Sequence, residues 1–198
     1  MPNLIPDFLP RGTLANRQQP CLQAGSMLVL RPWQASDVAA VVTAYADPQI
    51  QRWHLQTKDE AAASHWIDQW KVLWQNESNA GWAITDSVSG AVLGRMGLRE
   101  IHLDEGRAEA AYWVLPAARG RGVATAALQA LTEWAFQEIG LHRLTLVHSV
   151  HNAPSCRVAL KTGFDVEGVL RDYALHQDGW HDYHLHARLT PRRDHQRS

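Results

Sequence analysis

Cysteine is scarce in this chain of 198 residues, which contains two cysteines, Cys21 and Cys156. Such a pair makes neither a disulfide framework nor a cysteine-based metal cluster, so we expect two reduced thiols, with Cys156 serving packing. An apolar run of membrane length is also missing, and the first ten residues have neither a basic n-region nor an unbroken apolar stretch. These absences predict a cytoplasmic protein that does not enter a membrane.

A surplus of charge of one sign is lacking as well. Charged residues make up 20% of the chain and the net charge is -1. Nucleic acid is therefore not an expected partner, and any phosphate site has to be local. The length favours one domain. We expect an N-terminal arm at 1–26, which holds four prolines, a domain at 27–190 and a loose basic tail at 191–198, and a homodimer is left open.

Histidine is abundant, with eleven in the chain, and this invites a metal hypothesis. His184 and His186 share one face of a predicted strand and His181 faces the other way, so that segment supplies no three-ligand set. Ligands scattered over the chain are the alternative. We expect no metal.

Alternating and helical hydrophobic patterns predict an α+β fold with a mixed, mostly antiparallel sheet. Thr57 and Glu60 form a predicted capping box. About four helices are expected at 36–45, 57–76, 123–139 and 153–163. About seven strands are expected at 27–32, 81–85, 91–103, 108–115, 143–150, 164–175 and 180–189. The strand at 143–150 follows a helix and should run parallel to its predecessor, whereas short turns make the others antiparallel.

A basic, glycine-bearing turn joins the strand that ends near Leu115 to the helix that begins near Val123. The first N–H groups of a helix have no partner inside it and lie at the positive end of its dipole, so this turn predicts a phosphate site. An ordinary strand-to-helix turn is the simpler alternative. The turn lacks the complete glycine patterns of a P-loop or a dinucleotide fold.

Within that turn, Arg119-x-x-Gly122-x-Ala124 follows Pro116 by three residues. The motif resembles the coenzyme A loop of the GNAT family of N-acetyltransferases, and the element order over residues 27 to 189 is similar to the GNAT order. Asn152-x-x-Ser155 precedes Gly163-Phe164 and resembles the RimJ/RimL branch. Ala159 stands where many other members have a tyrosine, which agrees with that branch.

The resemblance implies a GNAT fold whose sheet is split at a central strand pair, with acetyl-CoA as co-substrate. It implies that main-chain groups around Trp113, Val114 and Leu115 hold the pantetheine arm. It also implies a loop that takes the pyrophosphate, formed by Arg119, Gly120, Arg121, Gly122, Val123, Ala124 and Thr125. Asn152 would contact the pantetheine arm or the acceptor, and Ser155 would lie near the sulfur and pass a proton to the thiolate. Both residues also suit a helix start.

Transfer to an amine needs a base, because a free amine is mostly protonated at neutral pH. Glu109 is the first candidate, since a charged residue in an apolar strand needs either a cleft or a salt bridge. Asp172, Tyr173 and Glu100 are rivals. Period two places Glu109 and Trp113 on one face of the strand and Tyr112 on the other.

The acceptor is either the α-amine of a peptide or protein, as the branch implies, or a small molecule with an aromatic ring. Trp66, Trp70 and Trp74 form a stripe on the predicted helix at 57–76. The stripe either packs on the sheet or, with Trp53 and Tyr173, forms a wall for the acceptor. Other function classes are a non-catalytic acyl-CoA-binding or regulatory module and an acyltransferase that uses another acyl-CoA.

Overall fold

The computed structural model describes residues 5–190, and the predicted tail at 191–198 lies outside the described residues. Eight strands form one sheet in the order β1-β2-β3-β4-β5-β6-β8-β7. The strands are β1 (Leu22–Ala24), β2 (Leu28–Pro32), β3 (Ala80–Asp86), β4 (Val92–His102), β5 (Arg107–Val114), β6 (Arg143–Ser149), β7 (Asp165–His176) and β8 (Gly179–Leu189). The α+β prediction is confirmed, with one strand more than the seven expected.

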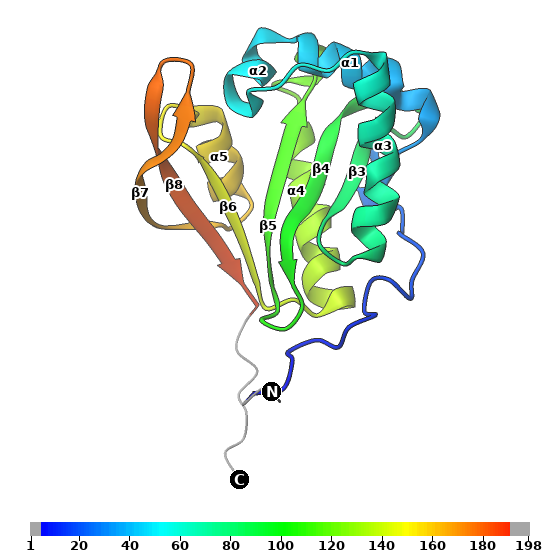
Figure 1. Cartoon of the computed structure of the whole chain (residues 1–198), viewed down its shortest axis with the longest axis vertical. Helices are drawn as coiled ribbons and strands as arrows, with labels where there is room; N and C mark the ends of the chain where they lie inside the picture. Colours follow the sequence, from blue (N-terminus) through cyan, green and yellow to red (C-terminus); the bar gives the residue numbers. More distant parts are fainter. Residues whose placement is uncertain (1–4, 191–198) are drawn as a thin grey trace.

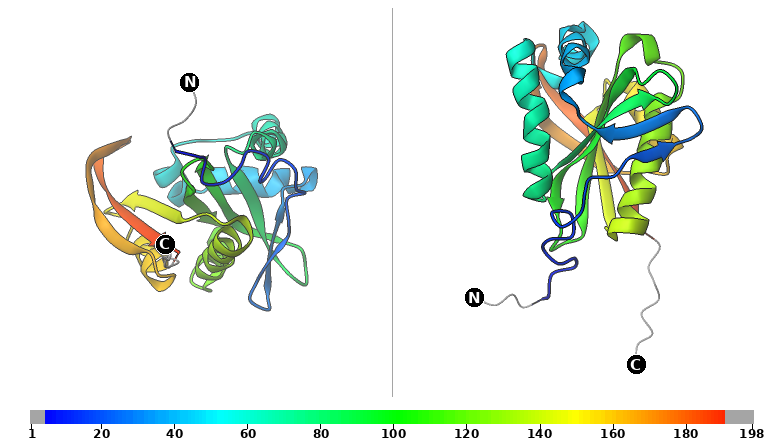
Figure 2. Two further views of the ribbon diagram at one scale, coloured as in Figure 1. Left: turned by 90° about the horizontal axis from the view of Figure 1, so that it is seen from below. Right: turned by 90° about the vertical axis from the view of Figure 1, so that its right-hand side faces the viewer.

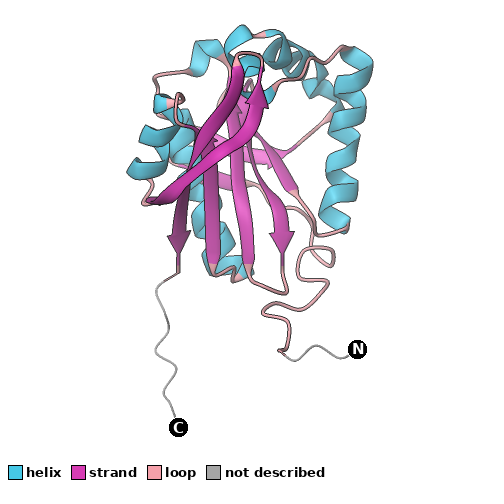
Figure 3. Cartoon of the chain, turned by 60° about the vertical axis from the view of Figure 1, so that its left-hand side comes forward, coloured by secondary structure: helices cyan, strands magenta, loops and turns pink. Residues whose placement is uncertain are grey.

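The α-helices lie on both faces of this sheet and across one end of it (Figures 1 and 3). They are α1 (Val38–Ala46), α2 (Pro48–His54), α3 (Glu60–Gln75), α4 (Val123–Trp134) and α5 (Ala153–Lys161). A π-helical turn, Ala135–Ile139, extends α4. Figure 2 shows α3 and α4 on opposite faces of the sheet. In the described part of the chain, no helix is long and apolar enough to cross a membrane.

The sheet is split between its central strands β5 and β6. These two strands run parallel and pair only from Arg107–Arg143 to Glu109–Thr145. Beyond Glu109 they diverge, as the open V of Figure 1 shows. A functional site can form there, because the peptide groups along the free edge of β5 are left without a neighbouring strand.

The N-terminal segment is not a separate arm, and that prediction is wrong for the described residues. Leu14 is 1% exposed, and β1 pairs with β2 to form one edge of the sheet. The indole N–H groups of Trp74 and Trp82 donate to the carbonyls of Arg17 and Pro20 at 2.9 and 2.8 Å. The sequence did not predict this packing, because prolines interrupt the hydrophobic periodicity of helices and strands but do not prevent a segment from being buried.

Two local predictions for the first helices also fail. Helix α3 is capped by Asp59, whose carboxylate accepts from the N–H of Ala62 at 2.8 Å, rather than by Thr57. Asp47 follows the end of α1 and also begins a helix that was not expected, α2, with Asp47 as N-cap and Pro48 in the first turn. Helix α2 was missed because it has only seven residues.

The tryptophan stripe of α3 packs against the sheet. Trp70 is 7% exposed and Trp74 3% exposed. Trp66 packs edge-on against Trp33 and Trp70, with ring centroids 5.0 and 5.3 Å apart. The stripe is therefore core, which was the first of the two sequence alternatives.

Candidate active site

The loop between β5 and α4 presents a row of backbone donors. Gly120 and Gly122 have φ angles of 74° and 76°, which glycine adopts without strain. Within the described residues, the N–H groups from Gly120 to Thr125 donate to no acceptor, and the first α-helical bond runs from Ala126 to Gly122. The donors lie at the positive end of the α4 dipole, so the loop can hold an anion such as a diphosphate.

Arg119 anchors this loop to α2. Its guanidinium donates to Asp47 at 2.5 Å, to Gln49 at 2.8 Å and to the carbonyl of Val114 at 3.1 Å. Burial raises the pKa of Asp47, but the hydrogen bonds that its carboxylate accepts from Arg119 and from the Ile50 N–H, together with the Arg119 charge, lower it overall. Arg119 thus fixes the loop geometry as well as bringing positive charge to it.

The free edge of β5 offers main-chain donors in line with the loop. The Leu115 N–H donates to Leu93 at 2.9 Å and so points toward β4. Because bonded and non-bonded residues alternate in an antiparallel pair, the peptide groups of Val114 and Tyr112 point the other way, toward the split. Of the three residues expected around the pantetheine arm, only Val114 has its N–H in this direction.

A groove and a cavity meet at the split. The groove, of about 480 Å³, runs along the loop, β5 and the start of α5. The cavity, of about 140 Å³, continues between β5 and β6. The residues that line both are Trp53, His54, Tyr112, Asn152 and Ser155. A thioester lying in the groove would therefore reach the cavity at this junction.

Two hydroxyl groups lie at the junction. Tyr112 Oη and Ser155 Oγ are 2.8 Å apart, and either atom can donate. Asn152 caps α5 by accepting from the Ser155 N–H at 3.2 Å, which places Ser155 in the first turn. Burial raises the pKa of Tyr112 to about 12 despite the bond to Ser155. The pair therefore stays protonated at neutral pH and can supply a proton.

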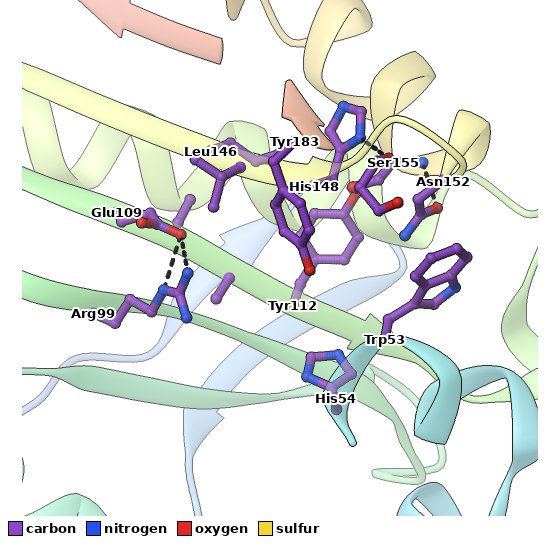
Figure 4. Close-up of a pocket in the computed structure, with 14 residues that line it drawn as sticks. Trp53, His54, Arg99, Glu109, Tyr112, Leu146, His148, Asn152, Ser155 and Tyr183 are labelled. Atoms are coloured by element: carbon purple, nitrogen blue, oxygen red, sulfur yellow. Dashed lines mark hydrogen bonds and ion pairs between the residues drawn. The ribbon is translucent and has the colours of Figure 1, made fainter. Parts of the chain in front are cut away.

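An ion pair between Glu109 and Arg99 lies at the end of the cavity away from the hydroxyl pair (Figure 4). Glu109 is 7% exposed and accepts from Arg99 Nε at 2.9 Å and from Arg99 Nη2. Burial raises the pKa of Glu109, although the positive charge of Arg99 opposes this. A carboxylate with a raised pKa can accept a proton from an ammonium group more readily than an exposed one.

His54 closes the cavity from the side of α2, as Figure 4 shows. Burial lowers the pKa of His54 to about 4, and the nearby Arg95 charge acts in the same direction. The ring is therefore neutral at physiological pH. Arg95 is itself buried beside Trp70, its guanidinium carbon 4.8 Å from the ring centroid.

The structure brings most of the sequence-predicted site residues together. The predicted cofactor residues that line the groove are Trp113, Val114, Arg119, Gly120, Gly122, Val123, Ala124, Thr125, Asn152 and Ser155. Leu115 and Arg121 are not among the lining residues. Glu109 and Trp53 line the cavity.

Trp66 and Trp70 do not form the predicted wall for the acceptor, because both pack in the hydrophobic core between α3 and the sheet. Tyr173 is 47% exposed and packs at a tilt against Tyr183, with ring centroids 5.0 Å apart, and Tyr183 lines the cavity. The rival bases Glu100 and Asp172 are exposed and line neither space.

The site residues that sequence reasoning missed include His54, Tyr112, Arg157 and Lys161. Arg157 and Lys161 lie four residues apart on α5 and both line the groove, and this i, i+4 spacing was a usable signal. Tyr112 was placed on the opposite face of β5 from Glu109. The cavity follows the open edge of the strand, so side chains of both faces reach it.

A helix N-terminus with free N–H groups, a groove beside an open strand edge and a hydroxyl pair at the split are features that suit an acyl-CoA-dependent acyltransferase. Residues 27–165 match the acetyltransferase (GNAT) domain family, and the chain belongs to that family. It is an N-acyltransferase, and enzymes of this family use acetyl-CoA.

Relatives and solved structures agree with this assignment. N-acetyltransferase YoaA of Bacillus subtilis strain 168, described as uncharacterized, is 26% identical over 169 residues, which cover 83% of this chain and 94% of YoaA. A ribosomal-protein-serine acetyltransferase of Escherichia coli K12 is 37% identical over 82 residues, covering 41% and 46% of the two chains. RimL, a ribosomal L7/L12 alpha-N-protein acetyltransferase solved with coenzyme A, superposes with a TM-score of 0.78 at 21% identity, covering 86% of this chain and 98% of RimL.

Proposed function

We propose that this protein transfers the acetyl group of acetyl-CoA to the α-amine of a peptide or protein, by direct attack in a ternary complex. The junction of groove and cavity carries the proposal, because it lets a thioester and an amine meet from opposite sides of one gap. The similarity to a ribosomal-protein-serine acetyltransferase and to RimL supports an acceptor of this class.

In this mechanism the loop amides bind the diphosphate, and Arg157 and Lys161 add positive charge to the opposite wall of the groove. The pantetheine arm follows the free edge of β5. The Val114 N–H faces the split, where it can bind the thioester oxygen and stabilise the negative charge that develops on it. Positioning of two bound substrates supplies much of the rate enhancement without a covalent enzyme intermediate.

Proton transfers use the two ends of the cavity. Glu109 takes a proton from the incoming ammonium group, directly or through water, so that the amine can attack the thioester carbon. The tetrahedral intermediate then collapses, the carbon–sulfur bond breaks, and the Tyr112–Ser155 pair donates a proton to the departing thiolate. The products are an acetylated amine and free coenzyme A.

The size of the cavity favours a chain terminus over a bulky aromatic acceptor. At about 140 Å³ it is well below the roughly 300–1,000 Å³ of pockets that enclose drug-sized ligands. A single amine-bearing residue fits such a space, and the rest of a peptide would extend outside. Trp53, at the mouth of the cavity, could then contact the second residue of that peptide.

A panel of acceptors tests the proposal by release of the coenzyme A thiol from acetyl-CoA. We expect turnover with a lysine-free peptide that has a free amino terminus, and none with the same peptide after formylation of that terminus. A formylated peptide with an internal lysine distinguishes α-amines from side-chain amines. Turnover only with aromatic amine antibiotics would overturn the peptide proposal, and tight acetyl-CoA binding with no turnover on any amine would favour a regulatory module.

A further inference from the structure

Four metal-ligand side chains converge beside the active site, on the face of the sheet that α5 covers. They are His148 on β6, His184 and His186 on β8, and Cys156 on α5. One ligand atom of each lies within 4.8 Å of the corresponding atom of every other. Figure 1 shows α5 packed beside β6 and the β7–β8 hairpin, and the register pairs His148 directly with His184.

The hydrogen bonds of two of these histidines fix their tautomers. His148 Nδ1 lies 2.8 Å from the carbonyl oxygen of Ser149, and His186 Nδ1 lies 3.1 Å from that of Phe164. A carbonyl only accepts, so both Nδ1 atoms carry the proton and donate it. Metal-binding histidines commonly use this arrangement, in which the outer nitrogen donates to the backbone and the inner one is free to bind.

The inner nitrogens of these two rings then face each other without a proton to share. His148 Nε2 and His186 Nε2 are 3.0 Å apart, and both residues are buried, at 4% and 0% exposure. Two lone pairs at this distance repel unless one ring becomes a cation or an electrophile lies between them.

The third histidine supplies independent evidence. His184 Nδ1 is buried and has no hydrogen-bond partner among the described residues. A polar atom that is buried without a partner destabilises the folded protein, and a bound ligand can satisfy it. Cys156 completes the set from the helix, and its side chain is partly buried.

We infer that His148, Cys156, His184 and His186 form a binding site for a divalent transition metal ion, of which Zn²⁺ fits the donors best. Three imidazoles and one thiolate suit a borderline-soft ion that prefers tetrahedral coordination. With bonds of roughly 2.0–2.3 Å, tetrahedral donor atoms lie about 3.3–3.6 Å apart, so donor atoms that are up to 4.8 Å apart here would move closer by at most about 1.5 Å.

Metal binding would tie α5 to the sheet next to the catalytic hydroxyl pair. Cys156 immediately follows Ser155, and His148 also lines the cavity. On binding, the Cys156 thiol gives its proton to solvent and coordinates the ion as a thiolate. The ion holds a helix in place and takes no part in the transfer step.

The test uses the full chain without a histidine tag, stripped with a chelator that is then removed. Titration with Co²⁺ should give one ion per chain, with tetrahedral ligand-field bands and a thiolate-to-cobalt charge-transfer band. Zn²⁺ should displace Co²⁺. At a free Zn²⁺ concentration 100 times Kd, Tm should rise by roughly 5–10 °C, a readout that does not depend on activity.

Matched variants locate the site. Cys156→Ser should abolish the charge-transfer band, and His184→Ala should weaken Zn²⁺ binding at least about 100-fold, more than loss of an outer-sphere partner does. Cys21→Ser and His65→Ala, which alter an exposed cysteine and an exposed histidine outside the cluster, should bind like the parent chain.

Three results would overturn the inference. The first is that the parent chain shows no saturable binding of Co²⁺. The second is that its Co²⁺ spectrum lacks the thiolate-to-cobalt band. The third is undiminished binding by a folded Cys156→Ser protein. Neither the spectrum nor the stoichiometry of the parent chain depends on whether the variants fold. A histidine pair that shares a proton would instead show an imidazolium signal and no metal uptake.

Discussion

Replacing Gly122 by glutamate should weaken acetyl-CoA binding about 100-fold, because it puts a carboxylate where the diphosphate is held. An ideal Cβ at this position has nothing within 4 Å, so the new side chain enters the groove without a clash. At about 6 Å, with an effective dielectric constant of about 40, each of two phosphate charges contributes about 1.4 kcal/mol of repulsion, or about 2.8 kcal/mol together.

The φ angle of 76° adds a separate destabilising effect, since a side chain in the left-handed region costs roughly 1–2 kcal/mol. Gly122→Ala carries this strain without the charge and should lose far less affinity than Gly122→Glu. Gly25→Glu is a second control, because Gly25 also has a positive φ of 68° and open space but does not line the groove. It should bind acetyl-CoA normally.

Isothermal titration calorimetry with acetyl-CoA measures these affinities directly, and thermal unfolding of each variant separates binding from folding. The repulsion should decrease with added salt, since the loop is exposed to solvent. An unchanged Kd for Gly122→Glu, in a variant that unfolds like Gly122→Ala, would refute the placement of the diphosphate.

Other perturbations test the remaining parts of the site. Trp70→Ala should lower the free energy of unfolding by roughly 3–5 kcal/mol and leave the acceptor KM unchanged, whereas a raised KM in a stable protein would restore the wall interpretation. Tyr112→Phe and Ser155→Ala should each lower kcat roughly 100-fold. Because the two hydroxyls act as a pair, the double variant should lose little more than either single variant, and additive losses would contradict that role. Because the pKa of Glu109 is raised above 4.5, kcat/KM should fall at acidic pH with a midpoint above 4.5, and this fall should disappear in Glu109→Gln. If the fall remains in that variant, a group other than Glu109 is the base. Because the pKa of His54 is lowered to about 4, only the unfolded chain binds a proton at this residue as the pH drops from 6.5 to about 4. The free energy of unfolding should therefore decrease as the pH drops through this range, and it should decrease less steeply in His54→Gln. Urea unfolding at several pH values measures both.

The sequence was most informative where one local pattern determines the structure. The loop glycines and the helix after them follow from local backbone preferences, and the structure has both. The short turn between β7 and β8 likewise predicted an antiparallel pair correctly. The parallel pairing of β5 and β6 followed from the crossover helix between them.

The errors arose where distant segments interact. The N-terminal segment is held by Glu77, whose carboxylate accepts the backbone N–H groups of Gly12 and Leu14 at 2.8 and 2.6 Å, and no local pattern reveals such a contact. The tryptophan stripe of α3 was compatible with core and with binding wall alike, and only the partners of the rings separate these alternatives.

The histidine cluster illustrates the same difficulty within the site. The period of β8 placed His184 and His186 on one face, but their neighbours His148 and Cys156 come from another strand and a helix. Only the register of β6 on β8 and the docking of α5 bring the four together. The sequence analysis left scattered ligands open as an alternative, but no pattern within one segment shows which residues they would be.

The central claim is that acetyl-CoA lies in the groove with its diphosphate on the loop amides and its sulfur at the hydroxyl pair. A crystal structure of the protein with coenzyme A tests this most directly. The account predicts diphosphate oxygens within hydrogen-bond distance of the N–H groups between Gly120 and Thr125, and the sulfur beside Tyr112 and Ser155. Coenzyme A bound elsewhere, or with its sulfur outside the split between β5 and β6, would contradict it.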